Sequence, residues 1–253
     1  MSSSIYIRIL PFLFWAFVWL FQQNQASGQL CTGSLGDPVV HIDFGSPSNP
    51  STGFSAPGYT YSSSSCPNDG FYTVTGFSTG CFGGAWHTVA ADHTGGGNYM
   101  LVNASYQPGD FFVKTVSNLC PNTTYEFSAW IMNVLISPTG IKPDITFRIE
   151  TPAGTILNQY STGGISVTSS PRWEQYGFYF TTTAGNTDVV IRMTNNAPGG
   201  QGNDLALDDI MFRPCGPVVT SEILGVSLPV NVCVYDQQSY TFTGSLSPGF
   251  VNP

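Results

Sequence analysis

The stretch from Tyr125 to Met132, YEFSAWIM, decides the fold because its side chains fall into two alternating sets. Successive side chains of an extended strand point to opposite faces, so this period of two predicts a β-strand with one buried face. Ile145 to Glu150, ITFRIE, repeats the pattern. Turn residues separate seven further strand-like segments: Val39 to Phe44, Phe71 to Thr75, Tyr99 to Asn103, Phe111 to Val116, Trp173 to Thr181, Val189 to Thr194 and Leu205 to Phe212. Nothing reads as a helix, and nine such segments predict an all-β, two-sheet antiparallel jelly-roll sandwich.

The same alternation predicts the core and a ligand face. One side of the strands is apolar and should form the core: Phe127, Ile131, Phe147, Ile149, Phe178, Phe180, Val189 and Ile191. The opposite side carries aromatic and polar groups: Glu126, Trp130, Arg148, Trp173, Gln175, Tyr179 and Arg192. Sugar rings stack on aromatic planes and hydrogen-bond around their edges. We therefore expect a polysaccharide or surface glycan, with an acidic sugar as one option, to bind these residues: Trp130, Arg148, Gln175, Tyr179 and Arg192.

Residues 1–28 are expected to be an export signal that is not part of the fold. Arg8 is the only charged residue in this segment, and it precedes a thirteen-residue apolar run from Ile9 to Phe21. That run is too short to span a bilayer but has the length of a signal-peptide core. The small residues Ala26 to Gly28 favour cleavage after Gly28, with a tilted membrane anchor as the alternative. We expect residues 29–217 to form an extracellular, cell-surface binding domain.

The composition argues against a nucleic-acid partner and gives no sign of an enzyme. Without Arg8, six Lys and Arg stand against fifteen Asp and Glu, a net charge of −9 that would repel phosphate backbones. Only 9% of the residues are charged while 14% are aromatic, which is typical of extracellular binding modules. No Gly-x-Ser-x-Gly or His-Glu-x-x-His motif is present, so we expect no catalytic activity.

Two pairs of residues could nevertheless carry chemistry. His87 and His93 could hold a transition metal with the help of Asp92, although histidines in a glycine-rich loop more often bond to the local backbone. Asp208 and Asp209 are neighbours on an expected strand, so their side chains should face opposite ways. Two carboxylates so placed cannot flank one glycosidic bond, which makes them a poor hydrolase pair.

Six cysteines in an exported chain favour disulfides over metal ligation. Fifteen pairings are possible, and the spacing alone does not choose among them. We expect a short loop closed by Cys66 and Cys81, and a link between the two ends of the domain made by Cys31 and Cys215. Cys120 has no assigned partner.

A domain boundary is expected at Pro214 to Pro217, because two prolines should stop any strand there. Residues 218–253 would then be a linker and the start of a second β-domain, with strands at Val230 to Tyr235 and Tyr240 to Phe242. Cys233 lies in this segment, and we expect downstream repeat domains in a longer chain.

Four motifs carry a resemblance to known families over residues 31–217. Asp92 to Met100, DHTGGGNYM, resembles the signature of MAM adhesion domains. Asn203 to Ile210, NDLALDDI, resembles the last strand that MAM domains share with jelly-roll carbohydrate-binding modules. Cys120 to Phe127 and Thr194 to Gly200 together resemble the amino-terminal module of large, gliding-motility-associated bacterial surface proteins with PKD or Ig-like repeats downstream. The resemblance implies a galactose-binding-like jelly roll.

The resemblance also implies a calcium ion and a missing disulfide. Jelly rolls of this kind often hold a structural Ca²⁺ between the first strand, one loop and the last strand, and Ca²⁺ prefers oxygen ligands. The matching carboxylates are Asp43, Asp92, Asp208 and Asp209, whose alternative role is to cap turns. The family would place cysteines at Gln201 and within Pro138 to Lys142, where this chain has none.

Two functional interpretations follow. The first is a secreted, calcium-stabilised adhesin module that binds carbohydrate, and the second is a MAM-like module that makes protein–protein contacts or caps a repeat array. An open sheet face with aromatic residues favours the first, and a face covered by loops favours the second. Trp130 could be buried under a loop, and Arg148 could simply pair with Glu150 or Glu126. If Trp130 belongs to the core, the ligand site is expected in the loops around Trp86 and His93.

Overall fold

The computed structural model describes residues 28–50, 54–216, 219–223, 226–227 and 244–246. The expected export signal and Cys233 lie outside these residues, as do the two strands expected between residues 230 and 242. The export signal and these two strands remain predictions.

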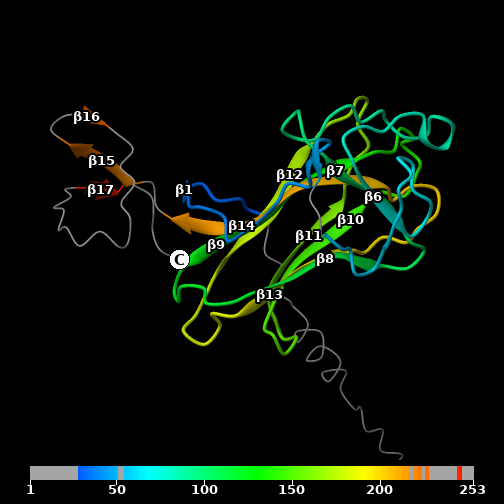
Figure 1. Ribbon diagram of the computed structural model, residues 1–253. Coiled ribbons are helices and arrows are strands. Elements are labelled where there is room, and N and C mark those ends of the chain that lie inside the picture. Colours follow the sequence, from blue (N-terminus) through cyan, green and yellow to red (C-terminus); the bar gives the residue numbers. More distant parts are fainter. Residues whose placement is uncertain (1–27, 51–53, 217–218, 224–225, 228–243, 247–253) are drawn as a thin grey trace, which may run out of the picture.

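Strands dominate the described chain (Figure 1). The early strands are β1 Ser34–Leu35, β2 Val40–Ile42, β3 Gly45–Ser46, β4 Asn49–Pro50, β5 Thr60–Tyr61, β6 Phe71–Thr75 and β7 Tyr99–Asn103. The later ones are β8 Gly109–Val116, β9 Thr124–Asn133, β10 Asp144–Glu150, β11 Ile156–Gly164, β12 Glu174–Thr181, β13 Val189–Asn195 and β14 Leu205–Gly216. One 3-10 turn, Cys81–Gly83, is the only helical element among the described residues.

Two sheets pack face to face. The large sheet has the order β12-β9-β14-β7-β6-β5, with β1 and β2 also paired to β14, and the small sheet has the order β11-β10-β13-β8. Apart from the parallel pair β5 and β6, the pairings within both sheets are antiparallel. The prediction of an all-β, two-sheet jelly-roll sandwich is therefore confirmed. Beyond it, β15 Val219–Ile223, β16 Val226–Ser227 and β17 Gly244–Leu246 form a separate small sheet.

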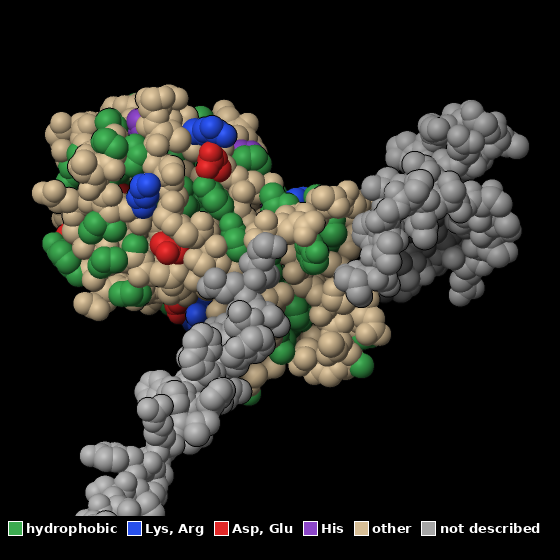
Figure 2. Space-filling model, turned by 180° about the vertical axis from the view of Figure 1, so that it is seen from behind, with side chains coloured by type: hydrophobic (Ala, Val, Ile, Leu, Met, Phe, Trp, Pro, Cys, Tyr) green, Lys and Arg blue, Asp and Glu red, His purple; other side chains and the backbone are tan. Residues whose placement is uncertain are grey.

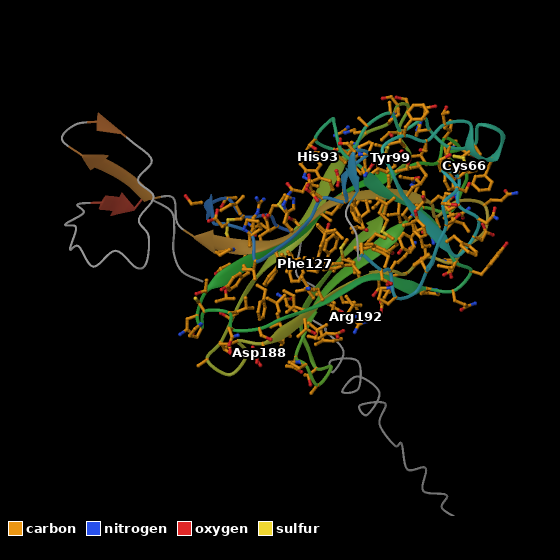
Figure 3. All side chains as sticks on the ribbon, viewed as in Figure 1. Cys66, His93, Tyr99, Phe127, Asp188 and Arg192 are labelled. Atoms are coloured by element: carbon orange, nitrogen blue, oxygen red, sulfur yellow. A yellow bond between two sulfur atoms is a disulfide. The ribbon has the colours of Figure 1, made fainter. Side chains whose placement is uncertain are left out.

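The core between the sheets is the one that alternation predicts. All eight apolar side chains expected there are buried. Phe127 of β9 lies at the centre, with its ring centroid 5.2 Å from that of Phe147 and 6.3 Å from that of Phe212 (Figure 3). Apolar burial of this extent is the main force that holds the two sheets together.

A second apolar cluster covers part of the other face of the large sheet. All five residues of β7 are buried, because Met100 and Val102 face the central core while Tyr99 and Leu101 join this second cluster. Trp86 from the loop between β6 and β7 packs onto it. One end of the large sheet is therefore covered on both faces, which simple alternation does not predict.

Both expected disulfides are present. Cys31 bonds to Cys215 with 5.9 Å between the Cα atoms, and Cys66 bonds to Cys81 with 5.4 Å. Cys120 is free and exposed. Disulfides persist in oxidising compartments, so these bonds indicate a chain that folds outside the cytoplasm. The described residues include no helix long and apolar enough to cross a membrane.

One expectation about the strands is wrong, and one long strand was not predicted. Pro214 does not stop β14, which runs on to Gly216, because the Pro214 carbonyl still accepts a hydrogen bond of 2.9 Å from the Gly36 N–H. Strand β11 went unpredicted because its sequence, ILNQYSTGG, is mostly polar and glycine-rich. It lies at the edge of the small sheet, where a strand needs fewer apolar residues.

Candidate functional site

The five residues predicted to bind a ligand do not share a surface. Trp130 and Gln175 are paired neighbours on β9 and β12 of the large sheet, where Tyr179 also lies. Arg148 and Arg192 are paired neighbours on β10 and β13 of the small sheet. The outer faces of two packed sheets point away from each other, so the prediction of one face is wrong. Alternation tells which side of a strand is polar, but it does not tell to which sheet the strand belongs.

Both arginines are engaged with carboxylates. The Arg192 Nη2 lies 3.2 Å from the Glu150 Oε2, and the Arg148 Nη1 lies 3.4 Å from the Glu150 Oε1. Arg192 also forms an ion pair with Asp110. Pairing of Arg148 with Glu150 was the alternative interpretation, and it describes the geometry. A sugar would have to break these pairs to reach either guanidinium.

The large-sheet part of the predicted face is covered. The ring of His93 stacks on Trp130 with centroids 3.7 Å apart. The Tyr179 hydroxyl donates to the Gln29 Oε1 at 3.2 Å, and the Cys31 N–H donates to the buried carboxylate of Glu126 at 2.8 Å. The loop containing His93 and the amino-terminal segment therefore lie over this face, which leaves no open aromatic platform there.

Replacing Trp130 by alanine should accordingly affect stability and not ligand binding. The half-buried indole loses its stack with His93, so we expect the free energy of unfolding to fall by about 1–3 kcal/mol. Urea denaturation and glycan titration of the same variant check this. Lost binding with an unchanged unfolding curve would restore the sheet face as the ligand site.

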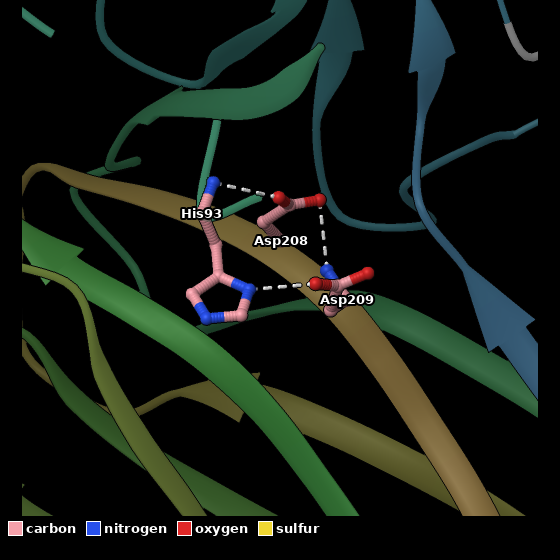
Figure 4. Close-up of side chains that lie close together, drawn as sticks. All are labelled: His93, Asp208 and Asp209. Atoms are coloured by element: carbon pink, nitrogen blue, oxygen red, sulfur yellow. Dashed lines mark hydrogen bonds and ion pairs between the residues drawn. The ribbon is translucent and has the colours of Figure 1, made fainter. Parts of the chain in front are cut away.

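The carboxylates predicted for calcium are also rearranged. His93, Asp208 and Asp209 each offer a donor atom within 4.8 Å of the others (Figure 4). Asp208 pairs with Trp130 and Met211 pairs with Ser128, so β14 has one extra residue at this point. Asp209 occupies this bulge with a φ of 45°. A bulge breaks the alternation, and the expectation that Asp208 and Asp209 face opposite ways is therefore wrong.

The other two predicted calcium ligands lie outside this cluster. Asp92 accepts hydrogen bonds from the Gly95 and Gly96 N–H groups at 2.6 and 2.7 Å, so it orders its own loop. Burial raises the pKa of Asp92, but its hydrogen bonds from Thr94 and the loop backbone outweigh this and hold the pKa below the ordinary value. Asp43 is exposed and accepts from the Gly45 N–H at 3.1 Å. Two carboxylates and an imidazole do not form the all-oxygen set that Ca²⁺ prefers.

His87 does not join His93. Its Nε2 lies 3.0 Å from the Thr168 carbonyl oxygen, and its side chain is buried. The structure therefore does not bring these two histidines together around a metal.

A pocket of about 350 Å³ lies at the loop end of the sandwich. It is lined by Asp69, Phe82, Ala85, Trp86, Asn103, Leu135, Ser137, Thr139, Gly140, Gly200, Gln201, Gly202 and Asp204. None of these residues is Lys or Arg. The pocket includes Trp86 from the loops named as the second place to look, but the sequence carries no signal that brings these distant segments together.

Phe82 stands at this pocket in an unusual conformation. Its φ of 51° and ψ of 45° are left-handed, which is rare and unfavourable for a bulky residue. Its neighbour Cys81 is tied to Cys66, and Gly83 and Gly84 also have positive φ. This turn holds the Phe82 ring 49% exposed, with its centroid 4.8 Å from that of Trp86.

The pocket contains one buried and one exposed carboxylate. Asp204 is buried and accepts hydrogen bonds from the Trp86 Nε1 at 3.0 Å and the Ala104 N–H at 3.3 Å. Burial raises the pKa of Asp204 to about 7, although both hydrogen bonds lower it. Asp69 is exposed, and its hydrogen bond raises the pKa of the neighbouring Tyr106.

The loops on the remaining side are held by backbone bonds. The Ile141 N–H donates to the Gln201 carbonyl at 2.9 Å, and the Asn203 N–H donates to the Ile141 carbonyl at 2.6 Å. The positions at which the family resemblance implies cysteines are thus neighbours here, joined by hydrogen bonds.

Comparison with known proteins finds distant counterparts of the fold. The CBM22-1 xylan-binding domain from Paenibacillus barcinonensis Xyn10C overlaps with a TM-score of 0.37 at 13% identity, over 72% of this chain and 97% of that one. A CBM4 structure overlaps with a TM-score of 0.34 at 16% identity, over 56% of this chain and 86% of its own. The enzymatically active domain of bacteriophage CBA120 tailspike protein 4 gives a TM-score of 0.36 at 11% identity, over 49% of this chain and 16% of its own. No protein-family model and no curated sequence matches.

These overlaps concern the β-sandwich and are too distant to indicate a ligand. Function therefore has to be argued from the pocket.

Proposed function

We propose that this chain is an exported, non-catalytic binding module that takes a sugar unit of a surface glycan or polysaccharide in the loop-end pocket. The observation that carries the proposal is Phe82, an aromatic ring kept half-exposed at the pocket in a left-handed turn beside a disulfide. An unfavourable conformation persists only where the surrounding structure enforces it, and such positions gather at functional sites.

The lining suits a sugar in both shape and chemistry. Small-molecule pockets occupy about 300–1,000 Å³, so this pocket has room for one or two sugar units. Phe82 offers a ring face for stacking, as aromatic side chains do in many binding sites. Around it, Asp69, Ser137, Thr139 and Gln201 offer hydrogen-bond acceptors and donors that could bind sugar hydroxyl groups.

The charge of the lining favours a neutral sugar. The pocket contains Asp69 and Asp204 but no Lys or Arg. A carboxylate on the ligand would meet like charge, so acidic sugars are disfavoured. The acidic sugar considered on the basis of Arg148 and Arg192 therefore loses its support, because these arginines lie on the small sheet and are paired with carboxylates.

The surface as a whole fits a role outside the cell. Charged side chains are few and scattered over the face shown in Figure 2, where apolar side chains lie among uncharged side chains and backbone. Such a surface suits a cell-surface adhesin whose weak single sites act in many copies. Affinities of roughly micromolar to millimolar per site would be raised by multivalency.

A glycan-array screen followed by titration tests the proposal. Replacing Phe82 by alanine should weaken binding of the best neutral glycan about tenfold, because the stacking surface is lost. The matched control is Phe77→Ala, since Phe77 is 52% exposed in the same loop but does not line the pocket. Equal affinity of the Phe82→Ala variant and the native chain for this glycan would show that the pocket is not the binding site.

A protein ligand is the second candidate. Phe82 and Tyr106 are exposed near the pocket, and Ile136 is exposed beside its lining residue Leu135, so apolar groups surround the opening. Protein contacts use such aromatic anchors. If no glycan on the array binds, the carbohydrate proposal fails and a protein ligand becomes the favoured interpretation.

A further inference from the structure

Two acidic side chains are buried together on β14 without a basic partner other than histidine. Asp208 and Asp209 are 1% and 4% exposed. Within the described residues, neither forms an ion pair with Lys or Arg, and the ion pairs of Asp209 are with His41 and His93. Burying charge without compensation is costly, so this cluster calls for a cation.

The donor atoms converge. The His93 Nδ1 lies 2.8 Å from one Asp209 carboxylate oxygen, and the His41 Nε2 lies 3.0 Å from the other. The donor atoms of His93, Asp208 and Asp209 lie within 4.8 Å of one another. Donors that share an ion at about 2.1 Å each are at most about 4.2 Å apart, so shifts of a few tenths of an ångström would close the set.

The surrounding structure holds these groups in place. The His93 ring stacks on Trp130, and the His93 N–H donates to the Asp208 carboxylate at 3.0 Å. The other Asp208 oxygen accepts from the Asp209 N–H at 2.8 Å, which fixes the bulge (Figure 4). Ligands that neighbouring contacts orient in advance lose little freedom when an ion binds.

One imidazole beside two carboxylates is a mixed nitrogen and oxygen set. Imidazole suits Zn²⁺, Cu²⁺, Fe²⁺ and Ni²⁺, whereas Ca²⁺ takes oxygen. We propose that His93, Asp208 and Asp209 form a transition-metal site whose expected occupant is Zn²⁺, with His41 as the hydrogen-bond partner that orients Asp209. The site lies apart from the sugar pocket and would join β2, the loop containing His93 and β14. Its role is therefore structural.

Metal binding by the purified chain, carrying no histidine tag, tests the site. Zn²⁺ should bind at one ion per chain and raise the melting temperature. Co²⁺ should give the visible absorption of a low-symmetry nitrogen and oxygen site. His41→Gln and Asp209→Asn should each weaken Zn²⁺ binding about tenfold or more. His41 is the safer variant, because its side chain is 39% exposed and makes no stack.

Two matched controls separate this site from the other metal interpretations. His87→Gln removes a histidine outside the cluster, and Asp43→Asn removes a carboxylate that only the calcium prediction includes. Both should leave Zn²⁺ affinity unchanged. The proposal is overturned if Zn²⁺ neither binds nor raises the melting temperature, or if His41→Gln and His87→Gln behave alike. It is also overturned if Ca²⁺ alone stabilises the chain and Asp43→Asn abolishes that effect.

Discussion

Replacing Phe127 by alanine is expected to lower the free energy of unfolding by about 3–5 kcal/mol. Phe127 is completely buried, and its ring contacts those of Phe112, Phe147 and Phe212 from both sheets. Removing the ring loses its transfer free energy and leaves a cavity that the surrounding strands cannot close without moving apart. Equilibrium unfolding in urea measures the loss as a lower midpoint at unchanged slope.

Phe77→Ala is the control for the Phe127 variant. Its side chain is 52% exposed, so removal should change stability by no more than about 0.5 kcal/mol. Similar losses at Phe77 and Phe127 would mean that the core does not lie between the two sheets.

Removing the disulfide between Cys31 and Cys215 should cost more stability than removing the one between Cys66 and Cys81. The bonds span 184 and 15 residues. A longer closed loop restricts the unfolded chain more, and the chain-entropy relation gives about 5 and about 3 kcal/mol. Paired Cys→Ser variants, unfolded thermally and in urea, provide the comparison. If strain in the native state dominates instead, the two losses of stability would be equal or reversed in order, and this prediction would be wrong.

Loss of glycan affinity should follow the opposite order, with the larger loss in the variant that lacks the bond between Cys66 and Cys81. Cys81 precedes Phe82 directly, so loss of its bond to Cys66 frees the turn that displays the ring. Cys31 and Cys215 lie where β1 pairs with β14 and do not line the pocket. Glycan affinity should therefore fall in the Cys66 and Cys81 variant and persist in the other, under conditions in which both are folded.

Local sequence pattern was sufficient for nine of the strands and for the core between the two sheets. The alternation in YEFSAWIM placed Phe127 and Ile131 inside, because a strand has only two faces. The chosen disulfides were also correct. Strand β11 escaped because an edge strand with little apolar content leaves no such pattern.

The site could not be predicted because it depends on how distant segments meet. Alternation grouped Trp130 with Arg192, but sheet pairing placed them on opposite sides of the sandwich. The extra residue of the bulge at Asp209 directs the carboxylates of Asp208 and Asp209 into the same cluster. The amino-acid composition does not reveal where a bulge lies. The pocket joins loops near Phe82, Thr139 and Gln201, whose proximity only the tertiary fold creates.

The central claim is that the ligand enters the loop-end pocket, and NMR shift mapping with the best neutral glycan tests it most directly. The account predicts that backbone amide signals move at residues 82–86, 137–140 and 200–204, while those around Gln175 on β12 and Arg192 on β13 stay in place. Shifts confined to β12 or β13, with the three loop segments unchanged, would contradict it.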